Sequence, residues 1–140
     1  MSPRQRVLIV EDEPTLRLAL RRILEEAGAE VVAVECVTDG LAQLVPGAGF
    51  TMVLSDLHLP DGLGTAVLER ARALGITRRA LSSGDRTALR EVDPDLATDL
   101  LTKPVSRTVL EALVGAISRS GTALRRPDLG GDRSGNGTQD

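Results

Sequence analysis

Residues 7–34 read VLIVEDEPTLRLALRRILEEAGAEVVAV, and this stretch decides the fold. It begins and ends with short β-branched runs, which are typical of strands buried on both faces of a sheet. Between these runs, apolar residues recur at helical spacing and charged residues occupy the opposite face, which predicts an amphipathic helix ending at Gly28. A strand, a helix and a second strand in this order form the repeating unit of a parallel α/β sheet.

The same alternation continues along the chain. A third strand is predicted at MVLS (52–55), and two weaker candidates are RALS (79–82) and DLLT (99–102). Helices are expected over 37–45, 64–74 and 87–92, and a last one follows Ser106 as N-cap. The apolar face of this last helix is predicted to consist of Val109, Leu110, Leu113, Val114 and Ile117. Right-handed crossovers then predict a doubly wound five-stranded parallel sheet in a three-layer α/β/α sandwich.

The length of 140 residues fits one domain, which we place at residues 5–120. Residues 121–140 are rich in Gly, Asp, Ser and Pro and lack periodicity, so we expect a disordered tail and no output domain. Because the chain starts with Met just before the first strand, we also expect a stand-alone protein.

Composition excludes several classes of function. The net charge of -3 and the absence of a basic run argue against nucleic-acid binding. Cys36 is the single cysteine, which excludes an intramolecular disulfide and a multi-cysteine zinc site. The first apolar run is too short for a signal peptide or a spanning helix, so we expect a cytoplasmic protein without a membrane partner.

Chemically active residues follow four of the five predicted strands. These strand ends carry EDE (11–13), Asp56, SSG (82–84) and KP (103–104). Each has an ordinary explanation alone, because acids favour a helix N-terminus, serines occur in turns and a lysine can be a solvated charge. Ligands of α/β sheets bind at the carboxyl ends of the strands, however, so these groups are expected to converge.

Such a cluster limits the chemistry that is available. Neighbouring carboxylates repel one another unless a cation compensates them, and Mg²⁺ prefers oxygen ligands of this kind. A carboxylate beside a magnesium ion is a competent nucleophile toward phosphorus. Lys103 is suited to neutralise the oxygens of the transferring group, and a serine hydroxyl can donate a hydrogen bond to it.

The motifs VLIVEDEP, SDLHLPDGLG, SSG and TKPV occur in the order and spacing of a response regulator receiver domain. Over residues 6–119 the chain resembles stand-alone chemotaxis regulators and the receivers of hybrid sensor kinases. This resemblance implies a flavodoxin-like strand order, 2-1-3-4-5, and a phosphoacceptor role for Asp56. It also implies a magnesium site made by Glu11, Asp12, Asp56 and the backbone carbonyl of His58.

By the same resemblance, Ser83 is the switch hydroxyl because it precedes a small residue, and Ser82 is the alternative. Lys103 would pair with the phosphoryl oxygens, and the bond between Lys103 and Pro104 would be cis. The implied function is that of a phosphoacceptor in a two-component phosphorelay. A histidine kinase or a phosphotransfer protein would be the donor, a downstream protein the target, and the receiver itself a monomer or weak dimer that catalyses only its own phosphorylation and dephosphorylation.

The chain departs from the family pattern in the output region. Leu100 stands where an aromatic residue is usual, Leu96 and Ala97 replace a common Gly-Ala pair, and the helix near residue 90 is short. The side chain of His58 is either an exposed imidazole, which we favour, or a contact for the attacking water of dephosphorylation. Two other functions stay open: a phosphohydrolase of the haloacid dehalogenase type, which needs a second acid where this chain has His58, and a docking module that is not phosphorylated.

Overall fold

Five parallel strands form the central sheet of the protein. The structure is a computed structural model that describes residues 4–118. The strands of the sheet are β1 (Arg6–Val10), β2 (Glu30–Val34), β3 (Met52–Asp56), β6 (Arg78–Ser83) and β7 (Asp99–Thr102). They lie in the order β2-β1-β3-β6-β7, and all neighbouring pairs are parallel. Because β6 and β7 are the fourth and fifth strands of this sheet along the chain, the order is the expected 2-1-3-4-5.

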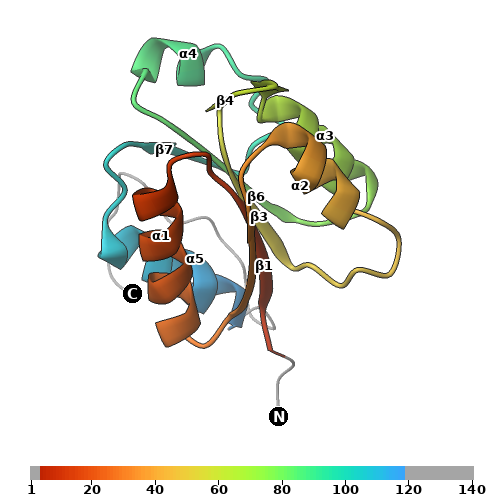
Figure 1. Ribbon diagram of the computed structural model, residues 1–140, viewed down its shortest axis with the longest axis vertical. Coiled ribbons are helices and arrows are strands. Elements are labelled where there is room, and N and C mark those ends of the chain that lie inside the picture. The colour runs from red at the N-terminus through yellow and green to blue at the C-terminus, as the bar shows by residue number, and fades with distance from the viewer. Residues whose placement is uncertain (1–3, 119–140) are drawn as a thin grey trace, which may run out of the picture.

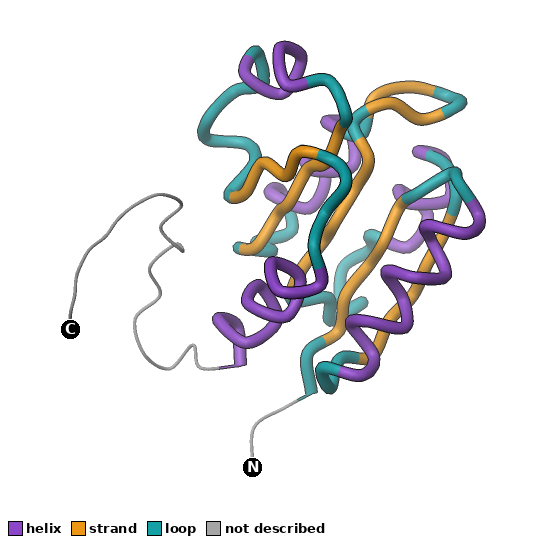
Figure 2. Tube along the Cα trace, turned by 90° about the vertical axis from the view of Figure 1, so that its left-hand side faces the viewer, coloured by secondary structure: helices purple, strands orange, loops and turns teal. Residues whose placement is uncertain are grey.

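Helices cover both faces of the sheet and complete the predicted three layers. The helices are α1 (Pro14–Glu26), α2 (Val37–Gln43), α3 (Thr65–Ala73), α4 (Arg86–Arg90) and α5 (Arg107–Ser118). Figure 1 shows α1 and α5 on one side of the sheet and α2 and α3 on the other. The turned view in Figure 2 shows the same separation, with α4 beyond the carboxyl end of the sheet.

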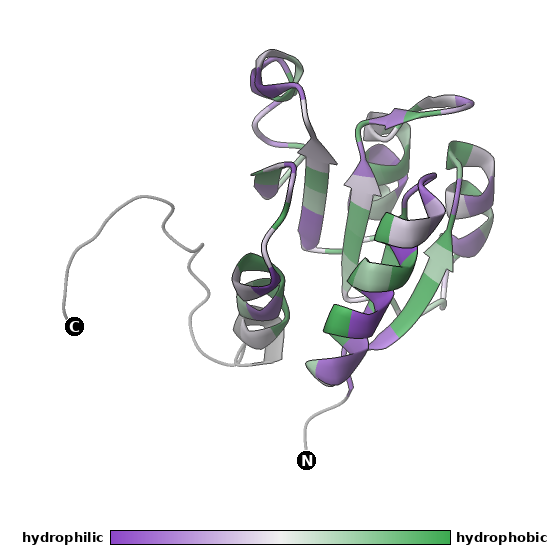
Figure 3. Ribbon diagram, turned by 60° about the vertical axis from the view of Figure 1, so that its left-hand side comes forward, coloured by the Kyte–Doolittle hydropathy of each residue, from purple (hydrophilic) through white to green (hydrophobic). Residues whose placement is uncertain are grey.

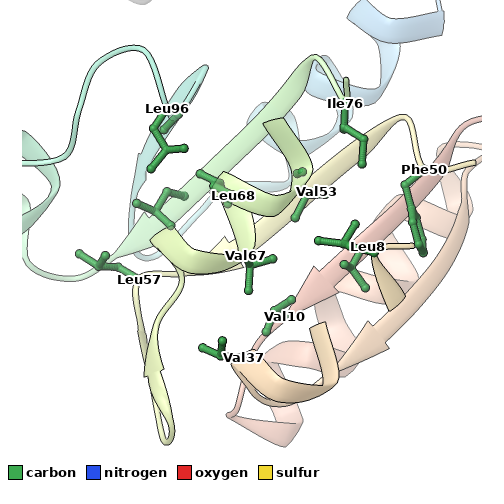
Figure 4. Close-up of a cluster of buried hydrophobic side chains, with 14 of the residues drawn as sticks. Leu8, Val10, Val37, Phe50, Val53, Leu57, Val67, Leu68, Ile76 and Leu96 are labelled. Carbon is green, nitrogen blue, oxygen red and sulfur yellow. The ribbon is translucent and has the colours of Figure 1, made fainter. Parts of the chain in front are cut away.

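Each face of the sheet has its own apolar core. Successive strand residues point to opposite faces, so Val7 and Ile9 of β1 pack under α1 and α5, whereas Leu8 and Val10 pack under α2 and α3. Figure 4 shows the second core, in which Val67 of α3 lies near Val10. In Figure 3 the helices carry hydrophilic and hydrophobic residues side by side, as amphipathic outer layers do.

The ends of the helices follow the sequence signals. Gly28 has φ 103° just past the end of α1, and this left-handed conformation is the one that favours glycine. Ser106 acts as predicted at the start of α5, where its hydroxyl accepts a hydrogen bond from the backbone N–H of Val109 at 3.1 Å. Gly40 lies inside α2 because the helix packs closely on β1: a Cβ there would be 3.0 Å from a methyl of Val10.

Two sequence predictions were inaccurate, and one element was not predicted at all. The element that was not predicted is the antiparallel hairpin of β4 (His58–Leu59) and β5 (Gly62–Leu63), which lies between β3 and α3. The fourth helix begins and ends earlier than predicted, at Arg86 and Arg90. Val109 was assigned to the apolar face of α5, but its side chain is 40% exposed, because the buried face is made by Leu110, Leu113 and Val114.

The Arg79 side chain bonds to the irregular segment between α4 and β7 and to the loop before β6. The guanidinium of Arg79 donates hydrogen bonds to the backbone carbonyls of Ile76, Asp95 and Leu96 at 2.8, 3.0 and 2.7 Å. These three carbonyls therefore have a hydrogen-bond donor, although they lie outside the helices and strands. The short α4 is therefore followed by an ordered loop. The predicted disordered tail, residues 121–140, and the side chain of Ile117 lie outside the described part of the chain.

Candidate functional site

The carboxyl ends of three strands bring two acids and a lysine into contact. Glu11 follows β1, Asp56 ends β3 and Lys103 follows β7. The Lys103 ammonium donates to Oε1 of Glu11 at 3.1 Å and to Oδ2 of Asp56 at 3.0 Å. Both carboxylates are buried, with Glu11 only 1% and Asp56 8% exposed. The parallel topology thus assembles the cluster that the strand ends predicted, from residues as far as 92 positions apart.

Burial and the neighbouring charges have opposite effects on the pKa values of Glu11 and Lys103. Burial raises the pKa of Glu11, although bonds from Lys103 and from the backbone N–H of Glu13 partly offset this effect. Burial alone would lower the pKa of Lys103, but its hydrogen bonds to Asp56 and Glu11 outweigh that penalty and raise the pKa overall. Lys103 therefore carries a firm positive charge between two acids.

Asp12 completes an acidic set that could hold a cation. Glu11, Asp12 and Asp56 each offer a carboxylate oxygen, and these atoms lie within 4.8 Å of one another. An all-oxygen donor set with several carboxylates fits Mg²⁺ and does not fit a softer metal. Asp12 is exposed, so a cation bound here would also be open to water and to a phosphoryl group.

The loop between β1 and α1 is organised so that two of its three acids remain available. Glu13 is the N-cap of α1: its carboxylate accepts from the backbone N–H of Leu16 at 2.6 Å. The guanidinium of Arg17 donates to the backbone carbonyl of Glu11 at 2.9 Å and fixes the loop. The ordinary explanation for an acidic strand end, helix capping, therefore applies to Glu13 and leaves Glu11 and Asp12 for the site.

Both candidate serines lie at the end of β6, with little exposure. Ser82 is the register partner of Asp56 on the neighbouring strand. The hydroxyl of Ser83 accepts from the backbone N–H of Asp85 at 2.9 Å, and its carbonyl accepts from the backbone N–H of Lys103 at the same distance. The bond between Lys103 and Pro104 is cis, as expected.

A pocket of about 280 Å³ opens beside the cluster. Lys103, Glu11 and Ser82 line it, and most of its remaining walls are apolar side chains of α1 and of the segment after β7, among them Leu16 and Val105. A molecule that reaches Lys103 and Glu11 from this side therefore contacts the apolar side chains that line the pocket.

The segment after Asp56 contains contacts that the sequence did not reveal. Gly64 packs against Asp56 so closely that a Cβ would lie 2.0 Å from the backbone carbonyl oxygen of Asp56. Asp61, at the tip of the hairpin, bonds to the start of α2. His58 begins β4 and is exposed. The only sequence signal here was the Asp61-Gly62 pair, which is typical of a turn.

A doubly wound parallel sheet with an acid cluster and a lysine at its carboxyl edge is the arrangement that the sequence resemblance implied for a receiver domain. The comparison with known families agrees: the response regulator receiver domain model matches residues 7–115, and the chain belongs to this family. It is a receiver domain of two-component systems, whose characteristic modification is phosphorylation of an aspartate. This membership also favours the receiver over the phosphohydrolase alternative.

Relatives of the chain include both sensors and regulators. It is 34% identical over 87% of its length to the sensor protein GacS of Pseudomonas syringae pv. syringae, and covers 14% of that protein. It is 38% identical over 81% of its length to the swarming motility regulation protein RssB of Serratia marcescens, and covers 52% of it. The chain therefore spans about half of RssB and a much smaller part of GacS.

The fold is also similar to solved receiver structures. A CheY-like response regulator receiver domain protein from Methanospirillum hungatei JF-1 superposes with a TM-score of 0.75 at 25% identity. The match covers 84% of this chain and 96% of that one. Within residues 4–118, no helix combines the length and the apolar character that crossing a membrane requires.

The departures in the output region have structural counterparts. Leu100, at the position where the resemblance expects an aromatic residue, is 44% exposed on the edge strand β7. Leu96 and Ala97, which replace the common Gly-Ala pair, are buried and pack in the core beneath α2 and α3. The differences from the family pattern are thus away from the acid cluster.

Proposed function

We propose that Asp56 is the phosphoacceptor of this receiver domain and that Glu11, Asp12, Asp56 and the backbone carbonyl of His58 hold Mg²⁺. The observation that carries the proposal is the contact of one ammonium, Lys103, with both Asp56 and Glu11. A lysine in this place lies within reach of any group attached to Asp56. The cluster of three acids supports the cation site.

The residues around Asp56 have separate tasks in phosphoryl transfer. A carboxylate oxygen of Asp56 attacks phosphorus and forms an O–P bond, while the P–N bond of a donor phosphohistidine breaks and leaves its electron pair on the imidazole. Lys103 neutralises charge on the equatorial oxygens. When bound, Mg²⁺ supplies further positive charge to the same oxygens. Ser83, or Ser82 in the alternative assignment, donates its hydroxyl hydrogen to the attached phosphoryl group.

The new dianion changes the partners of Lys103. Before phosphorylation, the Lys103 ammonium bonds to the carboxylates of Glu11 and Asp56. After phosphorylation, it also bonds to phosphoryl oxygens, which carry more negative charge. This exchange shifts a conformational equilibrium that a downstream protein reads. Since Leu100 lacks an aromatic ring, we infer that the shift reaches the β7 edge through aliphatic packing.

The donor is a histidine kinase or a histidine phosphotransfer protein. The receiver catalyses only its own phosphorylation and dephosphorylation and acts on no other substrate. The apolar wall of the pocket beside Lys103 supports a protein donor, because a protein can bury such a surface while presenting its phosphohistidine to Asp56. We place the protein in the cytoplasm, as a monomer or weak dimer.

Labelling of an Asp56 variant tests the proposal. Wild type, Asp56→Asn and Asp95→Asn are incubated with a small acyl phosphate and Mg²⁺, and covalent phosphate is measured by mass spectrometry. Asp95 is an exposed acid in the loop before β7, so its replacement makes the same charge change away from the site. We expect labelling of wild type and Asp95→Asn, no labelling of Asp56→Asn, and none without Mg²⁺. Equal labelling of all three proteins would refute the assignment, and an unlabelled wild type would favour an unphosphorylated docking module.

A further inference from the structure

The β4–β5 hairpin is fastened at its tip to a distant part of the chain. Oδ1 of Asp61 accepts from the backbone N–H of Val37 at 2.8 Å. Oδ2 accepts from the backbone N–H of Thr38 at 2.9 Å and from the Thr38 hydroxyl at 2.7 Å. Three hydrogen bonds therefore join the hairpin to the first turn of α2, across 23 or 24 positions of sequence.

The anchor point on α2 is itself fixed to the core. Val37 is buried and belongs to the core beneath α2 and α3, where Figure 4 shows it beside Val10 and Val67. Its side chain also approaches the hairpin, because a Cβ on Gly62 would lie 3.7 Å from a methyl of Val37. The tip of the hairpin is thus held against a part of the protein that cannot easily move.

The base of the hairpin is part of the candidate site. The backbone N–H of Leu57 donates to the carbonyl of Ser82 at 2.8 Å, and the N–H of Gly64 donates to the carbonyl of Leu57 at 2.8 Å. His58 follows directly as the first residue of β4. With two residues in each strand, such a hairpin is too short to keep its shape alone. The contacts at its tip add to these bonds at its base in holding the hairpin that carries His58.

We propose that Asp61 is a positioning residue for the cation site: by fastening the hairpin to α2, it holds the His58 backbone carbonyl beside Glu11, Asp12 and Asp56. This inference rests on the proposed function for the identity of the cation ligands. Asp61 is not one of the three clustered acids, and its carboxylate bonds to the start of α2, so it acts through the backbone of the hairpin.

The ionisation of Asp61 suits this task. Hydrogen bonds from the backbone and hydroxyl of Thr38 and from the backbone of Val37 lower the pKa of the Asp61 carboxyl to about 2. The carboxylate is consequently charged throughout the physiological range, and the fastening does not depend on pH there.

Thermodynamic linkage provides a test that does not depend on phosphorylation. If the fastening of Asp61 to α2 favours Mg²⁺ binding, then Mg²⁺ binding must strengthen the fastening by the same factor. The amides of Val37 and Thr38 report on it directly, because both donate to Asp61. Bound Mg²⁺ should therefore slow hydrogen exchange at these two amides.

The experiment compares Asp61→Ala with Asp39→Ala. Asp39 is exposed in the first turn of α2, and the structure shows no bond between it and the hairpin, so its loss removes the same charge without unfastening the tip. Mg²⁺ affinity is measured by titration calorimetry, since the chain has no Trp or Tyr for fluorescence. We expect Asp61→Ala to bind Mg²⁺ about 10-fold more weakly, the loss typical of an outer-shell partner, and Asp39→Ala to stay near wild type.

Hydrogen exchange and a milder variant complete the test. Mg²⁺ should slow exchange of the Val37 and Thr38 amides in wild type but not in Asp56→Asn. Thr38→Val, which removes only the hydroxyl bond, should give an intermediate affinity and keeps the test decisive if Asp61→Ala does not fold. The inference would be overturned if the folded Asp61 or Thr38 variants bound Mg²⁺ as tightly as wild type does. It would also be overturned if Mg²⁺ left the exchange rates of the Val37 and Thr38 amides of wild type unchanged. Failure of Asp56 labelling with these results intact would refute the proposed function alone.

Discussion

Replacing Gly64 with alanine should damage both the fold and the proposed phosphorylation site. The added Cβ would lie 2.0 Å from the carbonyl oxygen of Asp56 and 2.5 Å from the hydroxyl of Ser55. Ordinary contact begins at 3.4 Å, so the backbone would have to separate by the difference, 1.4 Å. Because the oxygen belongs to the buried strand β3, no side-chain rotation can relieve the clash.

The free-energy cost of this clash can be judged from substitutions that overpack the cores of other proteins. Extra methyl groups in well-packed sites cost about 1–3 kcal/mol, and a collision with backbone belongs at the upper limit, about 3 kcal/mol. For a domain of this size, that corresponds to a fall in melting temperature of roughly 10 °C or more. Since the displaced carbonyl is that of Asp56, the rate of labelling by an acyl phosphate should fall as well.

Gly84→Ala is the matched control for this substitution. Gly84 follows β6 at the same edge of the sheet, but a Cβ there meets nothing within 4 Å. Circular dichroism melts and phosphate labelling of the two variants decide the matter. A Gly64→Ala protein that melts within about 2 °C of wild type, where the expected fall is several times larger, would refute the reasoning from the close approach.

Two further predictions concern loops of the output region and the hairpin. Arg79→Met should destabilise the domain by about 2 kcal/mol in chemical denaturation, because three carbonyls lose their donor, and Arg79→Lys should recover only part of this loss. The hydrogen bonds of Asp61 to α2 should persist in acid. The pKa of this carboxyl is lowered from 3.8 in the unfolded chain to about 2 in the folded protein. Its ionisation therefore stabilises the fold fully above pH 3.8, and this stabilisation is lost as the pH falls through about 2. In an NMR titration from pH 7 to about 2, the amide signals of Val37 and Thr38 should therefore begin to change only below about pH 3, and a midpoint near 3.8 would contradict the hydrogen bonds.

The inner strands of the sheet could be predicted from local sequence because they are buried on both faces. VLIV is recognised as a strand of this kind without tertiary information, whereas VVAV lies on the edge strand β2 and is only partly buried. The hairpin of β4 and β5 could not be predicted, since two residues are too few for any periodicity to show. The position of Val109 was wrong because this residue lies at the edge of the apolar face, about 100° around the helix from Leu110 and about 140° from Val114, so the pattern alone did not show that it stays exposed.

The candidate site was predictable where topology alone determines the contacts. A parallel sheet puts the ends of β1, β3 and β7 together, so Glu11, Asp56 and Lys103 follow from strand positions. The proposed role of Asp61 depends on hydrogen bonds between the hairpin and the first turn of α2, which are far apart in sequence, and no local pattern encodes them. Arg79 is similar, because its partners are backbone carbonyls, which every residue type supplies.

The two serines at the end of β6 face different layers of the molecule. Ser82 lines the pocket beside α1, together with Leu20 and Leu54 of the core beneath α1 and α5. Ser83 alternates with it and shares a face with Leu81, which belongs to the core beneath α2 and α3. On the proposed function, a phosphoryl group that attracts Ser83 would therefore act on the core beneath α2 and α3, and one that attracts Ser82 would act on the core beneath α1 and α5. The direction in which the signal leaves the sheet thus identifies the serine that transmits it.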